Sequence, residues 1–225
     1  MDADQPTTPL ERLTLEPAGP ADSAVVWLHG LGADGHDFDP LFRQYRDRLP
    51  AGLKVILPHA PARPVTINGG MTMRAWYDIR SPELTGDVDR EGIRESAAAI
   101  GQILAELEGE GIAARRIVLG GFSQGGVLAL WTGLGHGRSL AGIAGLSAYL
   151  PEDPPVAEAQ RGTPLFLGHG RLDSLIPFSL GTAARDRLPD LGASIPAWHE
   201  YEMDHGVCGP EAEDLVDWLK GILAG

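Results

Sequence analysis

A serine stands among glycines at the point where an apolar run gives way to helical spacing. The segment RIVLGGFSQGGVLAL, residues 116–130, places Ser123 between Gly121 and Gly125 in the pattern Gly-x-Ser-x-Gly. Glycines on both sides permit a tight strand-to-helix turn, and the helix that follows directs backbone N–H groups and its positive dipole towards the serine. We therefore predict that Ser123 is the nucleophile of a nucleophile elbow.

A serine hydroxyl is a weak nucleophile unless a general base accepts its proton. Two histidines lie late in the chain. His199 falls inside IPAWHEYEM, an apparent strand, whereas His205 follows that strand in MDHGVCGP, in a turn before the last helix. Because catalytic groups gather at the carboxyl ends of parallel strands, we predict His205 as the base and His199 as a structural or surface residue.

The base in turn needs a carboxylate that orients its ring and stabilises the imidazolium. Asp173 follows the apolar run PLFLGHG, and so lies at the carboxyl end of a predicted strand. Asp153 lies in PEDPP with no clear strand before it, and Asp204 is adjacent to His205 only in sequence. We predict Asp173 as the acid, with another carboxylate as the alternative.

Acyl transfer also requires hydrogen-bond donors where negative charge develops on the carbonyl oxygen. One donor is expected from the backbone N–H of Gln124, directly after the nucleophile. The second is expected from the glycine-rich loop HGLGADG, which follows the early apolar run AVVWLH. The N–H of Leu31 is the candidate in that loop.

Other chemistry is not supported by the motifs. The seven histidines show no paired spacing such as H-E-x-x-H, so we expect no metal site. His29 and His169 each end a strand before a glycine, and we expect them to orient loops by hydrogen bonding. GGFSQGG and HGLGADG fit neither a phosphate loop nor a dinucleotide fingerprint, so no cofactor is expected. The single cysteine, Cys208, is expected to pack as a small apolar residue.

Composition narrows the class of protein. A chain of 225 residues, 43% hydrophobic and 22% charged, suits one globular domain over residues 1–225. The net charge of −13 opposes nucleic acid as a partner. The N-terminus lacks the regions of a signal peptide, and no run of about 18 apolar residues occurs. We expect a cytoplasmic protein without a membrane anchor. Oligomeric state is left open, a homodimer included.

The elements that must position these residues follow from the apolar pattern. Runs without strict alternation, typical of strands covered on both faces, lie at 24–29, 54–57, 116–120, 140–147 and 164–170. A helix is predicted from apolar residues at steps of four and three: Ile93, Ala97, Ile100, Leu104 and Leu107. A last helix is expected from Pro210. Alternation of strands and helices predicts a mainly parallel sheet with helices on both faces.

Two segments stand apart from this alternation. Residues 1–20 form either an N-terminal extension or a first strand. Residues 58–87 have little periodicity, yet they contain Met71, Met73, Trp76 and Tyr77, which are uncommon in disordered chains. We expect an ordered loop over the active site, the alternative being an excursion that covers an edge of the sheet.

Several blocks in the same order carry a family resemblance. LHGLGADGHDF, PHAPARPVTINGGMTMRAWYDI, GFSQGG, HGRLDSLIP and MDHGVC together resemble the phospholipase/carboxylesterase family of α/β-hydrolases, which includes bacterial carboxylesterases and acyl-protein thioesterases. The resemblance runs from about Val25 to the C-terminus. It implies the α/β-hydrolase fold, and the same triad and oxyanion donors that the residues themselves indicate. It adds that the 58–87 loop shapes an acyl-binding groove with Trp76 as a wall.

These observations predict a cofactor-free serine hydrolase. The leading expectation is a carboxylesterase that cleaves small-molecule esters of short to medium acyl chains through an acyl-enzyme. An acyl-protein thioesterase or lysophospholipase acting on long acyl groups is the alternative, because the same triad serves both leaving groups. A non-catalytic ligand-binding protein of the same fold is an alternative from another class.

Overall fold

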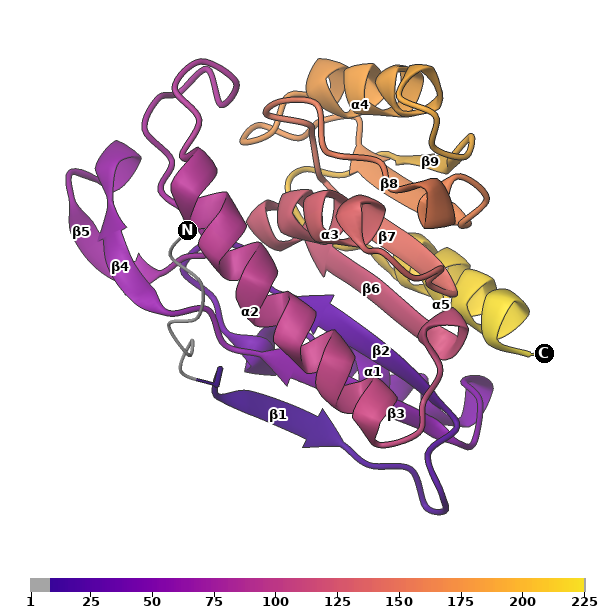
Figure 1. Ribbon diagram of the computed structural model, residues 1–225. Coiled ribbons are helices and arrows are strands. Elements are labelled where there is room, and N and C mark those ends of the chain that lie inside the picture. The colour runs from indigo at the N-terminus through magenta and orange to yellow at the C-terminus, as the bar shows by residue number, and fades with distance from the viewer. Residues whose placement is uncertain (1–8, 225) are drawn as a thin grey trace.

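A mainly parallel sheet forms the centre of the computed structural model, which describes residues 9–224 (Figure 1). Within that range seven strands pair in the order β1-β3-β2-β6-β7-β8-β9; β1 pairs antiparallel with β3, and the other five pairs are parallel. Their bounds are β1 Arg12–Leu15, β2 Ser23–Leu28, β3 Leu53–Pro58, β6 Ile117–Phe122, β7 Gly142–Leu146, β8 Leu165–Gly170 and β9 Ala197–Tyr201. Of residues 1–20, Arg12–Leu15 form β1, and residues 1–8 lie outside the described range.

Apolar side chains on both faces of the sheet explain why its strands lack alternation. In β2, Val25 and Trp27 join one buried cluster, while Val26 and Leu28 join the other. Helices α2, α3 and α4 pack on the cluster that contains Val26, and α1 and α5 pack on the opposite one. Their bounds are α1 Asp39–Gln44, α2 Arg90–Gly109, α3 Gln124–Gly135, α4 Phe178–Asp190 and α5 Gly209–Leu223. The predicted architecture, with helices on both faces, is confirmed.

The predicted periodicities match the helices that form. In α2, Ile93, Ile100, Leu104 and Leu107 are buried against the sheet, as steps of three and four residues require. The side chain of Asp89 caps this helix by accepting the N–H of Gly92. Because α2 begins immediately after the 58–87 segment, its N-terminal end anchors that segment near the catalytic edge of the sheet (Figure 1).

The 58–87 segment contains regular structure that its sequence did not reveal. Strands β4 (Ala62–Val65) and β5 (Met71–Arg74) form an antiparallel hairpin around a short 3-10 turn. An isolated bridge between Ile79 and Val88 then closes the base of a second loop. In Figure 1 this loop projects beyond the N-terminal end of α2, and the hairpin lies beside that end of the helix. Strands of four residues with exposed faces carry too few apolar residues for the period of two to be visible.

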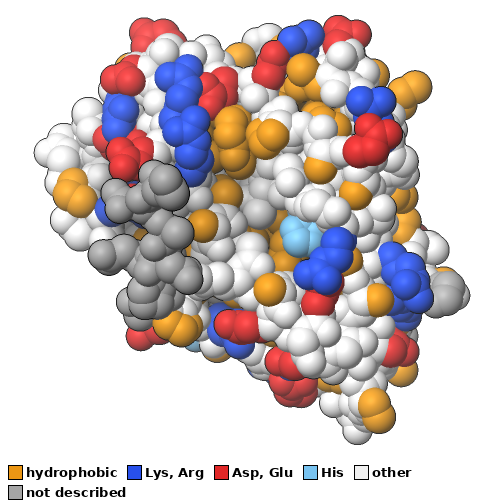
Figure 2. Space-filling model, viewed as in Figure 1, with side chains coloured by type: hydrophobic (Ala, Val, Ile, Leu, Met, Phe, Trp, Pro, Cys, Tyr) orange, Lys and Arg blue, Asp and Glu red, His pale blue; other side chains and the backbone are white. Residues whose placement is uncertain are grey.

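The described surface mixes charge types. On the face shown in Figure 2, acidic and basic side chains are interspersed, with hydrophobic side chains gathered between them in the upper half. In residues 9–224 no helix is both long enough and apolar enough to cross a bilayer.

Candidate active site

Ser123 occupies a strained turn between β6 and α3. Its backbone angles, φ 54° and ψ −122°, fall in a region that side chains rarely adopt. A Cβ atom on Gly125 would lie 2.3 Å from the carbonyl oxygen of Leu28, and one on Gly121 would lie 2.5 Å from the Gly125 backbone. The two glycines are therefore needed because the turn presses directly against β2, and this contact holds the Ser123 hydroxyl at the sheet edge.

The structure brings Ser123, His205 and Asp173 together from three separate loops. His205 Nε2 lies 3.0 Å from Ser123 Oγ, and His205 Nδ1 lies 2.8 Å from Asp173 Oδ2. A carboxylate only accepts hydrogen bonds, so Nδ1 carries the proton and the Nε2 lone pair faces the hydroxyl. Phe122 packs on the imidazole with ring centroids 4.8 Å apart. This is the geometry that a serine nucleophile and its base require.

Asp173 is buried and held from behind by its own loop. Its Oδ1 accepts the N–H groups of Leu175 at 3.0 Å and Ile176 at 2.8 Å. Burial by itself opposes ionisation, but the hydrogen bonds from His205 and from these two amides outweigh it, so the pKa of Asp173 lies below its usual range. The carboxylate consequently stays charged at neutral pH, which is what stabilising an imidazolium demands.

The two alternative carboxylates have other partners. Asp204 Oδ1 accepts the backbone N–H and the hydroxyl of Ser174, and the backbone N–H of His205, each at 2.7–2.8 Å. It therefore ties the acid loop to the base loop without touching the ring. Asp153 pairs with Arg187 on the surface. The geometry thus favours Asp173 among the three candidates.

Two backbone N–H groups remain available beside Ser123. Within residues 9–224 neither the N–H of Leu31 nor that of Gln124 donates to another group of the protein. Gly30 lies against the nucleophile, since a Cβ built on it would be 3.5 Å from Ser123 Cβ. The N–H of Gly32 donates to Arg74 O at 2.8 Å, which fixes the loop to β5. This arrangement leaves both predicted oxyanion donors free near the serine.

His29 fixes the loop that carries the N–H of Leu31. Its Nδ1 lies 2.7 Å from Gly30 O and its Nε2 accepts the N–H of Ala60 at 3.0 Å, so the ring is neutral with the proton on Nδ1. Burial lowers the pKa of His29 to about 4. The prediction that His29 orients a loop by hydrogen bonding is confirmed.

A pocket of about 390 Å³ opens over Ser123 and His205. Most of its lining is apolar, and the hairpin segment, the early loop and the acid loop all contribute to it. The lining residues that sequence reasoning did not identify are Ala33, Ile67, Asn68, Ile79, Leu84, Phe122, Leu175 and Ile176. No sequence pattern identifies these residues, because they come from four separate segments and each segment supplies only a few of them.

Trp76 lies away from this pocket. Its side chain is fully buried, and the indole N–H donates to His29 O at 2.9 Å. The Gln124 side chain accepts the N–H of Trp76 at 2.8 Å and donates to Tyr77 O at 2.7 Å. Trp76 therefore docks the 58–87 segment onto the elbow, and the residues of that segment that reach the pocket are others, Leu84 among them.

Three possible metal ligands gather near the end of β3. Donor atoms of Asp34, His36 and His59 lie within 4.8 Å of one another. However, His59 Nδ1 accepts the N–H of Gly35 at 3.0 Å, so its neutral ring carries the proton on Nε2 and has no lone pair left for a cation. His36 Nδ1 pairs with Asp34 at 2.9 Å. We assign this cluster to fixing the turn after β2.

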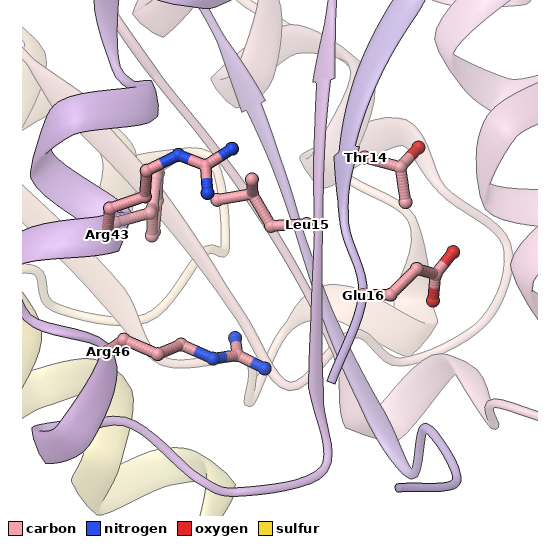
Figure 3. A pocket seen from close by; sticks show the side chains of 6 residues that line it. Thr14, Leu15, Glu16, Arg43 and Arg46 are labelled. Atoms are coloured by element: carbon pink, nitrogen blue, oxygen red, sulfur yellow. The ribbon is translucent and has the colours of Figure 1, made fainter. Parts of the chain in front are cut away.

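A second pocket, of about 430 Å³, lies between β1 and α1 (Figure 3). Arg43 and Arg46 extend towards Leu15 on one side of β1, whereas Glu16 points to the other side. Arg43 already pairs with Asp39 at 2.8 Å, Arg46 donates to a carbonyl of β3, and Glu16 lies 3.3 Å from a lysine ammonium. These polar groups already have partners, and the pocket contains none of the predicted site residues.

A buried carboxyl beneath the site gives a pH-dependent stability. Glu211 in α5 is fully buried, and within the described residues neither carboxyl oxygen has a hydrogen-bond partner. Burial, followed by the charges of Asp214 and Asp173, raises its pKa from 4.5 to about 8. Between these values the folded protein keeps a proton that the unfolded chain releases, so its free energy of unfolding falls as pH rises.

Glu211→Gln removes that slope because glutamine cannot ionise. Relative to wild type, the variant should gain up to about 1.4 kcal/mol of unfolding free energy per pH unit between pH 5 and 8. Urea unfolding at several pH values measures this difference. Glu213→Gln, at an exposed position of the same helix, is the control. Parallel pH dependence of wild type and Glu211→Gln would contradict the assignment.

Comparison with known proteins identifies the family of this chain. The phospholipase/carboxylesterase family model matches residues 11–223. Acyl-protein thioesterase 1 of Neurospora crassa is 38% identical over 213 residues, covering 89% of this chain and 87% of the relative. That of Yarrowia lipolytica is also 38% identical, covering 91% and 94%.

Solved structures give the same result. Arabidopsis thaliana SOBER1 superposes with a TM-score of 0.83 at 28% identity, covering 89% of this chain and 99% of that one. Acyl-protein thioesterase 2 of Zea mays superposes with a TM-score of 0.78 at 28% identity, covering 95% and 99%. The chain belongs to the phospholipase/carboxylesterase family of α/β-hydrolases.

Proposed function

We propose that this protein is a serine thioesterase that releases long acyl chains from thioesters, S-acylated proteins among them. The observation that carries the proposal is the Ser123–His205–Asp173 arrangement, at 3.0 and 2.8 Å, opening into an apolar pocket of about 390 Å³. Apolar pockets with a few polar groups at one end suit a substrate with an acyl chain and a reactive carbonyl.

Acylation begins when Ser123 Oγ attacks the thioester carbonyl carbon and His205 Nε2 takes its proton. Asp173, charged and fixed by two amides, stabilises the imidazolium that forms. The N–H groups of Leu31 and Gln124 bind the oxyanion, each contributing roughly 3 to 4 kcal/mol in the transition state. The bond between the carbonyl carbon and sulfur then breaks, and His205 gives its proton to the departing thiolate. The product of this half-reaction is an acyl-enzyme on Ser123.

Deacylation repeats these steps with water. His205 Nε2 removes a proton from a water molecule, the hydroxide attacks the acyl carbonyl, and the same two N–H groups bind the oxyanion. Collapse of this intermediate breaks the bond to Ser123 Oγ, which takes the proton back from His205, and releases the carboxylic acid, which then ionises in water. Because the neutral imidazole is needed, activity is expected to rise with pH through the acidic range.

The choice of thioesters over oxygen esters rests on the relatives. Sequence reasoning placed carboxylic esters of short and medium chains first, whereas the curated relatives at 38% identity are named acyl-protein thioesterases. The pocket supports an acyl chain as the group bound, since Ile67, Ile79, Leu84 and Leu175 supply apolar walls. A cytoplasmic location stays a prediction.

Matched thioesters and oxygen esters, from acetyl to palmitoyl, test this proposal. We expect kcat/KM for long-chain thioesters to exceed that for the matching oxygen esters by about tenfold, or 1.4 kcal/mol. A preference for acetyl or butyryl oxygen esters would instead show that the protein is a carboxylesterase.

A charge placed in the pocket should separate long from short chains. In Leu84→Asp a carboxylate enters the apolar lining, and kcat/KM for palmitoyl substrates should fall on the order of 100-fold, while acetyl substrates change by less than about threefold. Leu172→Asp is the control, because Leu172 is 63% exposed and does not line the pocket. Equal losses for both chain lengths would show that the acyl chain binds elsewhere.

A further inference from the structure

We propose that His169 is a positioning residue of the reaction, which acts through Asp173 and the loop behind it. The inference rests on the hydrolase function proposed above and extends it, because it concerns how strongly the acid holds the base. In this arrangement one oxygen of Asp173 faces two imidazole rings, those of His205 and His169.

The N–H of His169 binds the loop behind the acid and lies close to the carboxylate of Asp173. His169 Nε2 lies 2.9 Å from Ile176 O and 3.5 Å from Asp173 Oδ2. Both neighbours can only accept, so Nε2 carries the proton and donates to the carbonyl beside the carboxylate. The N–H of Ile176 in turn donates to Asp173 Oδ1 at 2.8 Å. Two hydrogen bonds at Ile176, one to its carbonyl from His169 and one from its N–H to Asp173, therefore hold the loop from 173 to 176.

The His169 ring has no freedom to turn away from this task. It is fully buried, and a Cβ on Gly181 of α4 would lie 2.3 Å from its Nδ1. Phe178 and Trp198 pack on it with ring centroids 5.9 and 6.3 Å away. Burial lowers the pKa of His169. The ring therefore stays neutral, and it presents a dipole to Asp173 without cancelling the carboxylate charge.

This dipole moderates how strongly Asp173 favours the imidazolium of His205. A donor near Oδ2 withdraws part of the negative charge that His205 Nδ1–H would otherwise receive, so the base releases its proton more readily. Glu211 of α5 is a buried carboxyl near Asp173; burial and the charges of Asp214 and Asp173 raise its pKa to about 8, so it is uncharged in the acidic range. Three other charged groups lie nearby. Asp204 is exposed, and the guanidinium groups of Arg171 and Arg185 lie over the rings of Phe178 and Trp198.

Profiles of kcat/KM against pH for two variants test the proposal. His169→Leu removes the donor without adding bulk, and we expect its acidic limb to move to higher pH by about half a unit, with kcat about tenfold lower. His169→Gln places an amide N–H near the position of Nε2, so it should return the limb and most of kcat towards wild type.

The outcomes are distinguishable from failure of the hydrolase proposal. If His169→Leu keeps the wild-type limb, or moves it to lower pH, the role assigned to His169 is wrong even when Ser123→Ala is inactive. If His169→Leu does not fold, His169→Asn replaces it, since its amide reaches only the position of Nδ1 and leaves Ile176 O and Asp173 without the donor. Its limb should then also lie above that of His169→Gln, and equal limbs would overturn the proposal.

Discussion

Replacing Ser123 by alanine is expected to lower kcat on acyl thioesters on the order of 10⁶-fold, because it removes the hydroxyl that lies 3.0 Å from His205 Nε2. The Cβ atom remains, and alanine adopts the φ of 54° about as readily as serine. The free energy of unfolding should therefore stay within about 0.5 kcal/mol of the wild-type value. Steady-state turnover and labelling by a fluorophosphonate measure the two consequences.

Asp173→Asn provides the matched test that these residues act as a unit. It should lower kcat about 10⁴-fold, since an amide no longer fixes the imidazole with its proton on Nδ1. In the double variant with Ser123→Ala the loss should equal that of Ser123→Ala alone. Turnover of Ser123→Ala above about one-hundredth of wild type, or additive losses in the double variant, would remove the proposed mechanism.

Gly125→Ala should be the most destabilising single-methyl change in the elbow. Its Cβ would lie 2.3 Å from Leu28 O and 2.5 Å from His29 O, and neither backbone atom can retreat without moving β2. We expect the free energy of unfolding to fall by about 3 kcal/mol or more, and activity to be lost because Ser123 and the Leu31 loop move apart. Urea unfolding with a turnover assay on the remaining folded fraction checks both.

Gly101→Ala is the matched control for that substitution. Gly101 lies inside α2, and a Cβ built on it meets nothing within 4 Å. Alanine should therefore raise the free energy of unfolding by roughly 0.5 to 1 kcal/mol through helix propensity, and leave activity unchanged. If both glycine variants proved equally stable, close packing of the elbow on β2 would not be what selects glycine at 125.

The sequence by itself determined the local features of this site. The Gly-x-Ser-x-Gly pattern between an apolar run and a helical pattern located Ser123 in its turn, because that turn is built by residues next to one another in the chain. The alternation of apolar runs and helical patterns predicted the mainly parallel sheet. It also placed Asp173 and His205 after strands whose carboxyl ends share one edge. The structure brings these residues together at hydrogen-bond distance.

Only the tertiary structure decided the features that depend on contacts distant in sequence. Trp76, expected to line the acyl groove, is fully buried and its indole N–H donates to His29 O, while Ile67 and Leu84 reach the pocket. The second contact of Asp173, with His169, likewise follows from how the loop after β8 turns back on its strand. Spacing along a chain fixes which edge of the sheet a residue occupies, but the direction of its side chain is set by packing against elements that lie far away in sequence.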